Sequence, residues 1–515
     1  MFAKTFSAGI LGIEAFLVEV EVDITRSGLP TLHMVGLAEG AVKESKERVL
    51  AALKNCGFKL PSSRITINLA PADQRKEGSL FDLPLAIGLL AGSEVLPLQV
   101  LNQYILAGEI SLTGELRPIA GALPIALLAR QKGFRGVILP QQNALEAAVV
   151  QDIDILGVKT LVEVVNFFNN SNTLTPIKVD VAEIFTKRQH FWIDFAEVKG
   201  QETAKRAIEI AAAGGHNLLF VGPPGSGKTM LAQRIPTVLP PLSFEEALEV
   251  TKIYSVSNQL GENTPLIVHR PFRSPHHTIS DAGLIGGGRY PRPGEVSLAH
   301  RGVLFLDELP EFKKNVLEVL RQPLESGEVT ISRAAISLRY PANFMLVAAM
   351  NPCPCGYLGD EKHTCTCTLN QIQRYRSRLS GPLLDRIDLQ VEVPAVDYKH
   401  LRSPKNGLNS ETMRSRIIEA RKIQQVRYRK ENLPFLTNSE LSGKWLQHFC
   451  PLGHQEHDFL EQAVNRLGLS ARAYTRILRI SRTIADLEGR EYINSEILAE
   501  AISYRFLDRK EQLLG

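Results

Sequence analysis

The stretch FVGPPGSGKTM, Phe220–Met230, contains a glycine-rich loop with the spacing of a nucleotide-binding site. It satisfies the pattern G-x-x-x-x-G-K-[ST] and lies between a strand-like run, NLLFVG, and a helical run. In such a loop, backbone N–H groups surround nucleotide phosphates, Lys228 neutralises the β- and γ-phosphate oxygens, and the Thr229 hydroxyl is a Mg²⁺ ligand. The predicted ATP-binding residues are Gly222, Pro223, Pro224, Gly225, Ser226, Gly227, Lys228 and Thr229.

A second segment supplies the carboxylates that this chemistry needs. In GVLFLDELPE, residues 302–311, four apolar residues typical of a buried strand end in Asp307 and Glu308. A carboxylate at the C-terminal end of a parallel strand points into the crevice where the phosphates lie. We therefore expect Asp307 to hold Mg²⁺ and Glu308 to polarise the attacking water. The alternative is a solvated acidic turn.

From about residue 200 to 395 the chain resembles the AAA+ ATPases, in the branch that magnesium chelatase motor subunits share with MCM helicases. The resemblance is carried by EVSLAHRGVLFLDELPEF, by VLRQPLESGEVTISRAAISLRYPANFMLVAAMNPCPCG and by LSGPLLDRIDL. It implies that Asn351 senses the γ-phosphate, that Arg386 reaches into a neighbouring subunit's site, and that Arg472 senses nucleotide from its own subunit. An arginine that acts in trans requires abutting subunits, so the resemblance implies a homo-oligomeric ring, a hexamer.

Two basic segments are candidates for DNA contact. Residues 270–302 form a glycine-rich insertion that, in the resembling branch, projects toward the ring's centre. EVTISRAAISLRYPA, residues 328–342, alternates around an Ala-Ala turn and predicts a hairpin. Copies of such loops around a pore would grip DNA without sequence preference and in a salt-sensitive way, whereas the alternative is ordinary solvated charge. The predicted DNA-binding residues are Arg273, Arg289, Arg333 and Arg339.

Four of the six cysteines fall within fifteen residues, in CPCGYLGDEKHTCTC. Four thiolates this close, with turn-forming residues between the pairs, favour one tetrahedral structural zinc, with His363 a lesser candidate. Unliganded reduced thiols and a redox role remain as alternatives. Such a site would brace the neighbouring Asn351 rather than perform chemistry. The predicted zinc ligands are Cys353, Cys355, Cys365 and Cys367.

The first 168 residues alternate β-rich runs with helical ones and predict an α/β domain. LAPADQRKEGSLFDLPLAIGLLAG and LAGEISLTGELRPIAGALPIALLARQKGFRGVILP resemble the proteolytic domain of the Lon family. That family uses a serine and a lysine, and the corresponding positions here are Leu80 and Leu123. Without a base to activate a hydroxyl, nucleophilic catalysis has no route, so we expect no peptidase activity. Ser79 with an unidentified base is the remaining alternative.

The composition is that of a soluble globular protein of two or three domains. The 515 residues carry a net charge of +4, and residues 1–180, with 16 basic and 18 acidic side chains, contribute −2 to it. We expect no signal peptide and no membrane span, because the most apolar run is broken by Pro84, Glu94 and Pro97. The clustered cysteines favour a reducing, cytoplasmic setting.

The predicted organisation is a Lon-like domain over 1–168, a linker over 169–190, an AAA+ core over 191–395, a linker over 396–411 and a helical lid over 412–515. The fold class is thus α/β: a P-loop ATPase core with a C-terminal helical lid, preceded by a Lon-protease-like (S5-like) domain that lacks the catalytic dyad. This arrangement resembles, over nearly the whole chain, the ComM/YifB family of bacterial magnesium chelatase-like proteins.

That resemblance implies an ATP-driven hexameric DNA helicase or branch-migration motor, acting on single-stranded and branched DNA in natural transformation and recombination, with recombination proteins as further partners. The alternatives are a protein-remodelling ring and a magnesium chelatase-type motor. Arginine and histidine in the projecting loops, with Tyr290 the one aromatic residue at the insertion's centre, favour nucleic acid over polypeptide.

Overall fold

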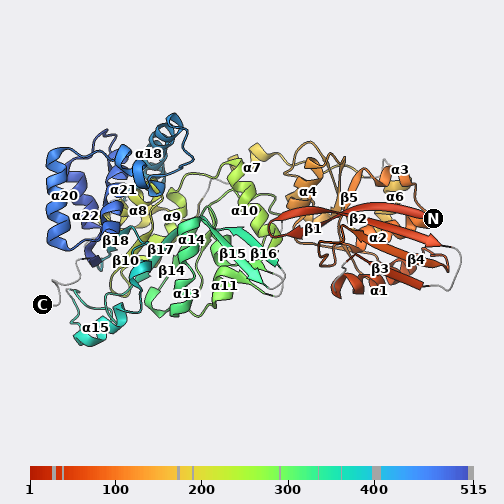
Figure 1. Ribbon diagram of the computed structural model, residues 1–515, viewed down its shortest axis with the longest axis horizontal. Helices are drawn as coiled ribbons and strands as arrows, with labels where there is room; N and C mark the ends of the chain where they lie inside the picture. Colours follow the sequence, from red (N-terminus) through yellow and green to blue (C-terminus); the bar gives the residue numbers. More distant parts are fainter. Residues whose placement is uncertain are drawn as a thin grey trace. The chain divides into compact units, whose positions relative to one another are not determined.

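A computed structural model describes residues 1–25, 31–36, 40–170, 174–187, 191–261, 263–288, 291–333, 336–360, 362–396 and 407–508. The chain forms two compact units (Figure 1). The first contains Met1–Arg188 and Ser243–Val268, and the second contains Gln189–Leu242 and His269–Gly515. Among the described helices, none is both long and apolar enough to cross a bilayer.

The first unit is built on a mixed seven-stranded sheet in the order β3-β4-β2-β1-β5-β8-β9. The long β1 and β2 pair antiparallel, whereas β1, β5, β8 and β9 run parallel. Strand β4 alternates buried and half-buried residues, as its sequence RITINLA predicts. The strands are β1 Phe2–Leu11, β2 Glu14–Thr25, β3 Thr31–Val35, β4 Arg64–Ala70, β5 Tyr104–Leu106, β8 Gly136–Pro140 and β9 Asp154–Val158, with a small β6–β7 ribbon, Glu109–Ile110 and Leu116–Arg117.

Helices complete the core of this unit, and α2 is buried along its whole length because its sequence, DLPLAIGLLAG, is apolar on every side after its first residue. Within the predicted linker 169–190 the structure has a short helix, α7. The helices are α1 Gly40–Asn55, α2 Asp82–Gly92, α3 Leu98–Leu101, α4 Ala122–Gln131, α5 Ala144–Ala147, α6 Leu161–Asn169 and α7 Val181–Lys187.

One helix of the first unit comes from far along the chain. Helix α10, Phe244–Val256, begins with a capping box formed by Ser243 and Glu246. Its C-terminal turn is joined to the start of α4, since Gly121 N donates to Ser255 O at 3.1 Å. Residues 243–268 fall inside the range predicted as the ATPase core, but the structure places them in the first unit.

The second unit contains a five-stranded parallel sheet in the order β11-β14-β17-β10-β18. Strands β10, β14 and β17 are buried throughout, as their continuous apolar sequences predict. Because all strands are parallel, their carboxyl ends share one edge of the sheet. The strands are β10 Leu218–Val221, β11 Phe272–Arg273, β14 Val303–Leu306, β17 Met345–Met350 and β18 Leu389–Glu392.

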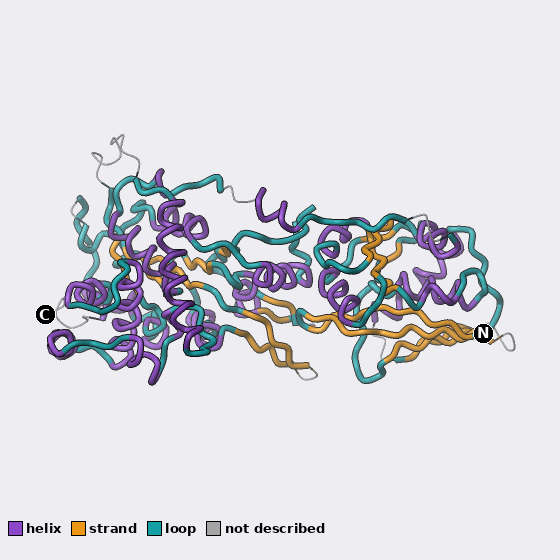
Figure 2. Tube along the Cα trace, turned by 90° about the horizontal axis from the view of Figure 1, so that it is seen from above, coloured by secondary structure: helices purple, strands orange, loops and turns teal. Residues whose placement is uncertain are grey.

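A separate two-stranded hairpin is formed by β15, Glu328–Arg333, and β16, Ile336–Pro341. Its register, with Glu328 opposite Pro341 and Arg333 opposite Ile336, confirms the predicted hairpin. Figure 2 shows its two strands extending away from the body of this unit. The preceding insertion holds short elements: α11 Asp281–Ile285, β12 Gly286–Gly287, β13 Arg292–Pro293 and α12 Glu295–Leu298.

Helices surround the sheet and form the C-terminal region. Helix α21 carries an apolar face against the core, and its first turn is capped by Ser470, whose side chain accepts from Ala473 N. The remaining helices are α8 Glu202–Gly214, α9 Lys228–Val238, α13 Lys314–Glu318, α14 Arg321–Ser326, α15 Leu369–Arg376, α16 Gly381–Leu384, α18 Ser410–Lys430, α19 Gly443–Phe449, α20 His454–Leu467, α21 Ala471–Leu487 and α22 Ser495–Ser503.

Candidate functional site

The glycine-rich loop connects β10 to α9, as the motif requires. Gly225 and Gly227 have φ of 75° and 93°, in the left-handed region that glycine adopts without strain. Gly227 also occupies the N-cap of α9 and provides no side-chain cap. The first backbone amides of α9 are therefore left for an anionic ligand, and the helix dipole favours a phosphate there.

Lys228 is the cation of this loop and is held in place by three oxygens. Its Nζ donates to Gly222 O at 2.7 Å, to Pro223 O at 2.8 Å and to Asn351 Oδ1 at 3.2 Å. Burial lowers the pKa of Lys228, while the charges of Asp307 and Glu308 act in the opposite direction. The Lys228 ammonium group is thus surrounded by the loop itself, by Asn351 after β17, and by the carboxylates of Asp307 and Glu308 after β14.

Thr229 and Asp307 form the candidate Mg²⁺ site. Thr229 Oγ1 donates to Asp307 Oδ2 at 2.7 Å, although the two residues lie 78 positions apart in sequence. They meet because α9 and the end of β14 open onto the same edge of the sheet. A hydroxyl and a carboxylate are the hard oxygen donors that Mg²⁺ prefers, so the residues present fit this ion.

Glu308 follows directly and stands in a left-handed conformation with φ of 51°. Its backbone N donates to Asp307 Oδ1 at 2.9 Å. Its carboxylate is 59% exposed and lies 3.4 Å from His277 Nδ1, a residue of the basic insertion. The catalytic carboxylate predicted from the sequence is thus open to solvent, and the insertion contacts it, which the sequence did not reveal.

The four cysteines predicted to bind zinc come together. Their sulfur atoms lie within 4.8 Å of one another, and Cys353 Sγ is 3.3 Å from Cys355 Sγ and 3.7 Å from Cys365 Sγ. A tetrahedral zinc with Zn–S bonds of about 2.3 Å requires sulfurs roughly 3.8 Å apart. Backbone amides of Tyr357 and Thr366 lower the pKa of the Cys355 thiol to about 5, whereas for Cys365 and Cys367 a backbone hydrogen bond is outweighed by burial and the neighbouring thiols, which raise the pKa. The donor set fits zinc.

The cysteine loop lies against the P-loop. A Cβ on Gly356 would lie 2.6 Å from Pro224 Cδ, so only glycine permits this approach. Asn351, two residues before Cys353, accepts from Lys228 through its side-chain Oδ1. His363 lies apart from the cysteine cluster, with Nδ1 3.3 Å from Asp360 Oδ1.

The two arginines implied by the family resemblance share one cavity of about 560 Å³. Arg386 follows α16, donates through Nη1 to Pro382 O at 2.6 Å and pairs through Nη2 with Glu325. Arg472, near the start of α21, pairs with Asp385 at 2.8 Å. No P-loop residue is among the described residues that line the cavity. Arg472 thus lines the same cavity as Arg386, and its role as a nucleotide sensor in its own subunit stays a prediction.

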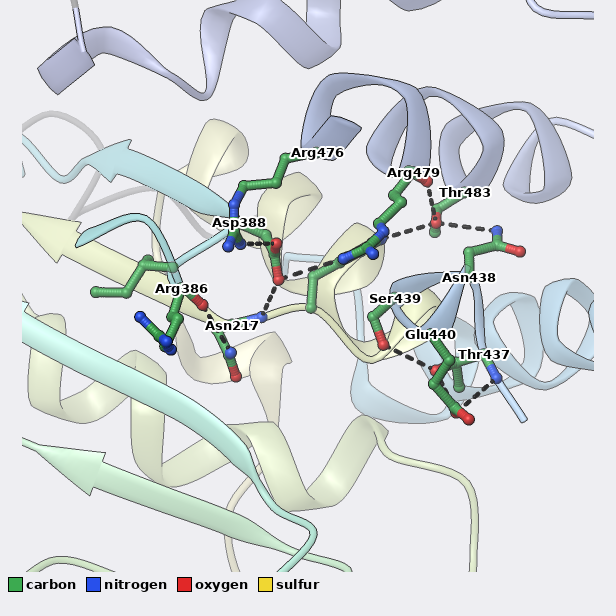
Figure 3. Close-up of polar contacts among 12 residues, drawn as sticks. Asn217, Arg386, Asp388, Thr437, Asn438, Ser439, Glu440, Arg476, Arg479 and Thr483 are labelled. Atoms are coloured by element: carbon green, nitrogen blue, oxygen red, sulfur yellow. Dashed lines mark hydrogen bonds and ion pairs between the residues drawn. The ribbon is translucent and has the colours of Figure 1, made fainter. Parts of the chain in front are cut away.

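A buried carboxylate fixes the arginine helix to the sheet (Figure 3). Asp388, the residue before β18, pairs with Arg476 of α21 and accepts from Asn217 N at 3.0 Å. Burial acts to raise the pKa of Asp388, but the charge of Arg476 and the hydrogen bond with His216 outweigh it and hold the pKa well below its usual range. Asp388 is therefore ionised, and α21 is tied to the strands that flank the P-loop.

The predicted DNA-binding arginines separate into distinct cases. Arg273 lies on the edge strand β11 and forms two bonds to Glu295, at 2.6 and 2.7 Å, so its charge is paired within the protein, and its contact with DNA stays a prediction. Arg339 projects from β16 with a 76% exposed side chain, 3.7 Å from Glu328. Arg289 and the Arg333 side chain lie outside the described residues.

The dyad positions in the first unit are apolar. Leu80 and Leu123, which stand where the Lon family has serine and lysine, are 9% and 0% exposed. The adjacent Ser79 donates to Glu109, which also lies 3.5 Å from Arg117. Both dyad positions are thus parts of a packed core rather than of a nucleophilic centre.

Family models match most of the chain. The model described as magnesium chelatase, subunit ChlI, covers residues 194–401, and that of its C-terminal region covers 407–505. A third, described as subunit ChlI of Mg-chelatase, covers 20–143.

Curated relatives extend the similarity to the whole chain. Competence protein ComM of Haemophilus influenzae is 47% identical over 100% of this chain and 99% of its own length. YifB of Escherichia coli is 46% identical over 97% of this chain and 96% of its own. Lon protease 2 of Bacillus subtilis is 30% identical over 29% of this chain and 30% of its own. Together with the parallel sheet, the P-loop and the helical C-terminal region, these likenesses show that the chain belongs to the ComM/YifB family of magnesium chelatase-like AAA+ proteins.

Proposed function

We propose that this protein is an ATP-driven, ring-forming DNA motor that migrates branches or separates strands during natural transformation and homologous recombination. The observation that carries the proposal is the full-length similarity to a competence protein in a chain whose ATP-site residues converge. The DNA that it would act on is single-stranded and branched, and recombination proteins are candidate partners.

Each residue of the nucleotide site would have its own role in ATP hydrolysis. Loop amides and Lys228 would hold the phosphates, and Thr229 with Asp307 would hold Mg²⁺, which supplies charge neutralisation. Glu308 would orient a water for in-line attack on the γ-phosphorus and accept its proton as the bond to the ADP oxygen breaks. Asn351, whose Oδ1 accepts from Lys228 Nζ, would sense the γ-phosphate.

The cavity with Arg386 and Arg472 supports assembly into a homo-oligomeric ring, which we propose is a hexamer. No P-loop residue is among the described residues that line this cavity, so we propose that Arg386 serves the nucleotide of a neighbouring subunit, and that Arg472 is a nucleotide sensor. The hairpin arginines, Arg333 and Arg339, would then face a DNA backbone together with Arg289 of the insertion.

The four-cysteine loop is proposed to hold a structural zinc that braces Asn351 and the P-loop. We expect the purified protein to contain about one zinc per chain, and the paired change Cys365→Ser and Cys367→Ser to remove it and lower the ATPase rate about tenfold. Metal analysis and ATPase assays on the same preparations test this, with Cys56→Ser, a free cysteine of the first unit, as the control. Equal zinc content in both variants would contradict it.

The function is tested by displacement of a labelled strand from synthetic forked and three-strand DNA. Wild type is expected to displace the strand with ATP at low salt, and activity should fall as salt rises because phosphate contacts release counterions. Glu308→Gln at the same salt is the control for ATP dependence. No displacement, together with an ATPase that ignores DNA, would overturn the proposal in favour of a protein-remodelling or chelatase-type motor.

A further inference from the structure

The cavity that Arg386 and Arg472 share is also lined by the base of the β15–β16 hairpin. Both ends of the β15–β16 hairpin reach it, since Gly327 precedes β15, Asn343 follows β16, and both line the cavity. Helix α14 contributes the residue that pairs with Arg386, namely Glu325. The base of the candidate DNA hairpin and the candidate trans arginine are therefore parts of one local structure.

Arg386 is not free to reach another subunit in this conformation. Its side chain is only 15% exposed. The guanidinium pairs through Nη2 with Glu325 and donates through Nη1 to Pro382 O. Its Nε is buried and has no partner among the described residues. Glu325, in contrast, is 64% exposed, so the carboxylate can move into solvent at low cost.

Arg472 differs from Arg386 in this respect. Its side chain is 67% exposed, and its partner Asp385 lies next to Arg386 in sequence. Arg472 can therefore turn toward a neighbouring subunit without leaving a packed position. Of the two arginines, Arg386 is therefore the one whose side chain is held in place, and it is also the one expected to stabilise transition-state charge.

Short contacts tie the helix that carries Glu325 to the hairpin. The single Ser326 Oγ–H lies within hydrogen-bond distance of two acceptors, Gln322 O at 3.0 Å within α14 and Glu328 O at 3.1 Å on β15. Gly327, with φ of 69°, makes the turn between α14 and β15. Its carbonyl accepts from Ala342 N, directly after β16, at 2.8 Å. These contacts provide a direct route by which a displacement of the hairpin would reach α14 and Glu325.

We propose that Glu325 restrains Arg386 and that DNA bound to the hairpin releases it, so that DNA switches on hydrolysis in the neighbouring subunit. This rests on the proposed function for its DNA and ring, but the restraint itself is a property of two side chains. While Glu325 and Arg386 are paired, Arg386 cannot reach the nucleotide of the neighbouring subunit. With α14 displaced, the guanidinium turns outward and the carboxylate is solvated.

The test is the ATPase rate of the full-length protein with and without single-stranded oligonucleotide, for wild type and Glu325→Gln. The substitution keeps shape and removes charge, so we expect the rate without DNA to rise about threefold to fivefold, and stimulation by DNA to shrink by the same factor. The KM for ATP should stay constant, because no contact to the chain's own P-loop changes. Glu318→Gln is the matched control, since Glu318 pairs with Arg321 of α14 and not with Arg386.

Two further variants separate a switch from a general effect on folding. Glu325→Asp keeps the charge and should return the basal rate toward wild type, and Glu325→Gln combined with Arg386→Ala should be inactive. A basal rate in Glu325→Gln equal to or below that of wild type would overturn the restraint. A wild type that DNA does not stimulate would contradict the link to the hairpin and the DNA-motor function, while the basal rates would still decide the restraint.

Discussion

Glu308→Gln should bind ATP with nearly wild-type affinity and hydrolyse it about 10²- to 10⁴-fold more slowly, because an amide cannot accept the proton of the attacking water. The P-loop contacts that hold the nucleotide do not involve this carboxylate. Lys228 keeps its three oxygen partners, and Thr229 keeps Asp307. Equilibrium ATP binding and steady-state phosphate release, measured on the same protein, would separate the two effects.

The matched control for this change is Glu311→Gln. Glu311 lies three residues further on, is similarly exposed at 44% and pairs with Arg378 at 2.8 Å. Its loss should leave turnover within about twofold of wild type, since exposed ion pairs contribute little. Normal turnover in Glu308→Gln would remove Glu308 from the catalytic role and turn attention to His277, which faces the same carboxylate.

Arg386→Ala should lose about 10³-fold or more in ATPase rate while its own P-loop remains intact, because trans arginines stabilise charge that develops only in the transition state. Its backbone place should survive, since the Arg386 carbonyl accepts from Asn217 Nδ2 at 2.8 Å through a group that the substitution retains. Arg378→Ala, a half-exposed arginine paired with Glu311, is the control.

Mixing decides whether Arg386 acts in trans. A Lys228→Ala subunit lacks a working P-loop but carries Arg386, and an Arg386→Ala subunit has the converse defect. In mixed rings some interfaces combine an intact loop with an intact arginine, so activity should reappear in proportion to their frequency. If the two inactive proteins restore no ATPase when mixed, the trans assignment fails.

The nucleotide site could be predicted from the sequence because its parts depend on local patterns. Two patterns can each be recognised within about ten residues. One is a glycine loop between a strand and a helix, and the other is a buried strand that ends in two carboxylates. The fold class is confirmed, and the hairpin pairs as the Ala-Ala turn predicted. The proximity of Thr229 to Asp307 then follows from parallel strands that end at one edge.

What the sequence did not disclose depends on partners far apart along the chain. Nothing near Arg273 indicates that Glu295, 22 residues later, neutralises it. The pairing of Arg386 with Glu325 spans 61 positions, and that of Arg472 with Asp385 spans 87. Family likeness named these arginines, but Arg472 lies on α21, and that helix is anchored through the pair between Arg476 and Asp388, a contact without a local pattern.

Helix α10 gives the chain a property that a list of domains hides. Because residues 243–268 belong to the first unit, the polypeptide passes between the units three times, near 188, 242 and 268. The units are therefore not interchangeable cassettes. A truncated chain that begins at residue 191 would keep α10 without the core that Leu248 packs against, and a gene fusion at one boundary would sever only one of the three passages. Modular shuffling of this architecture requires coordinated cuts at three places, which is a reason for the two units to be inherited as one piece.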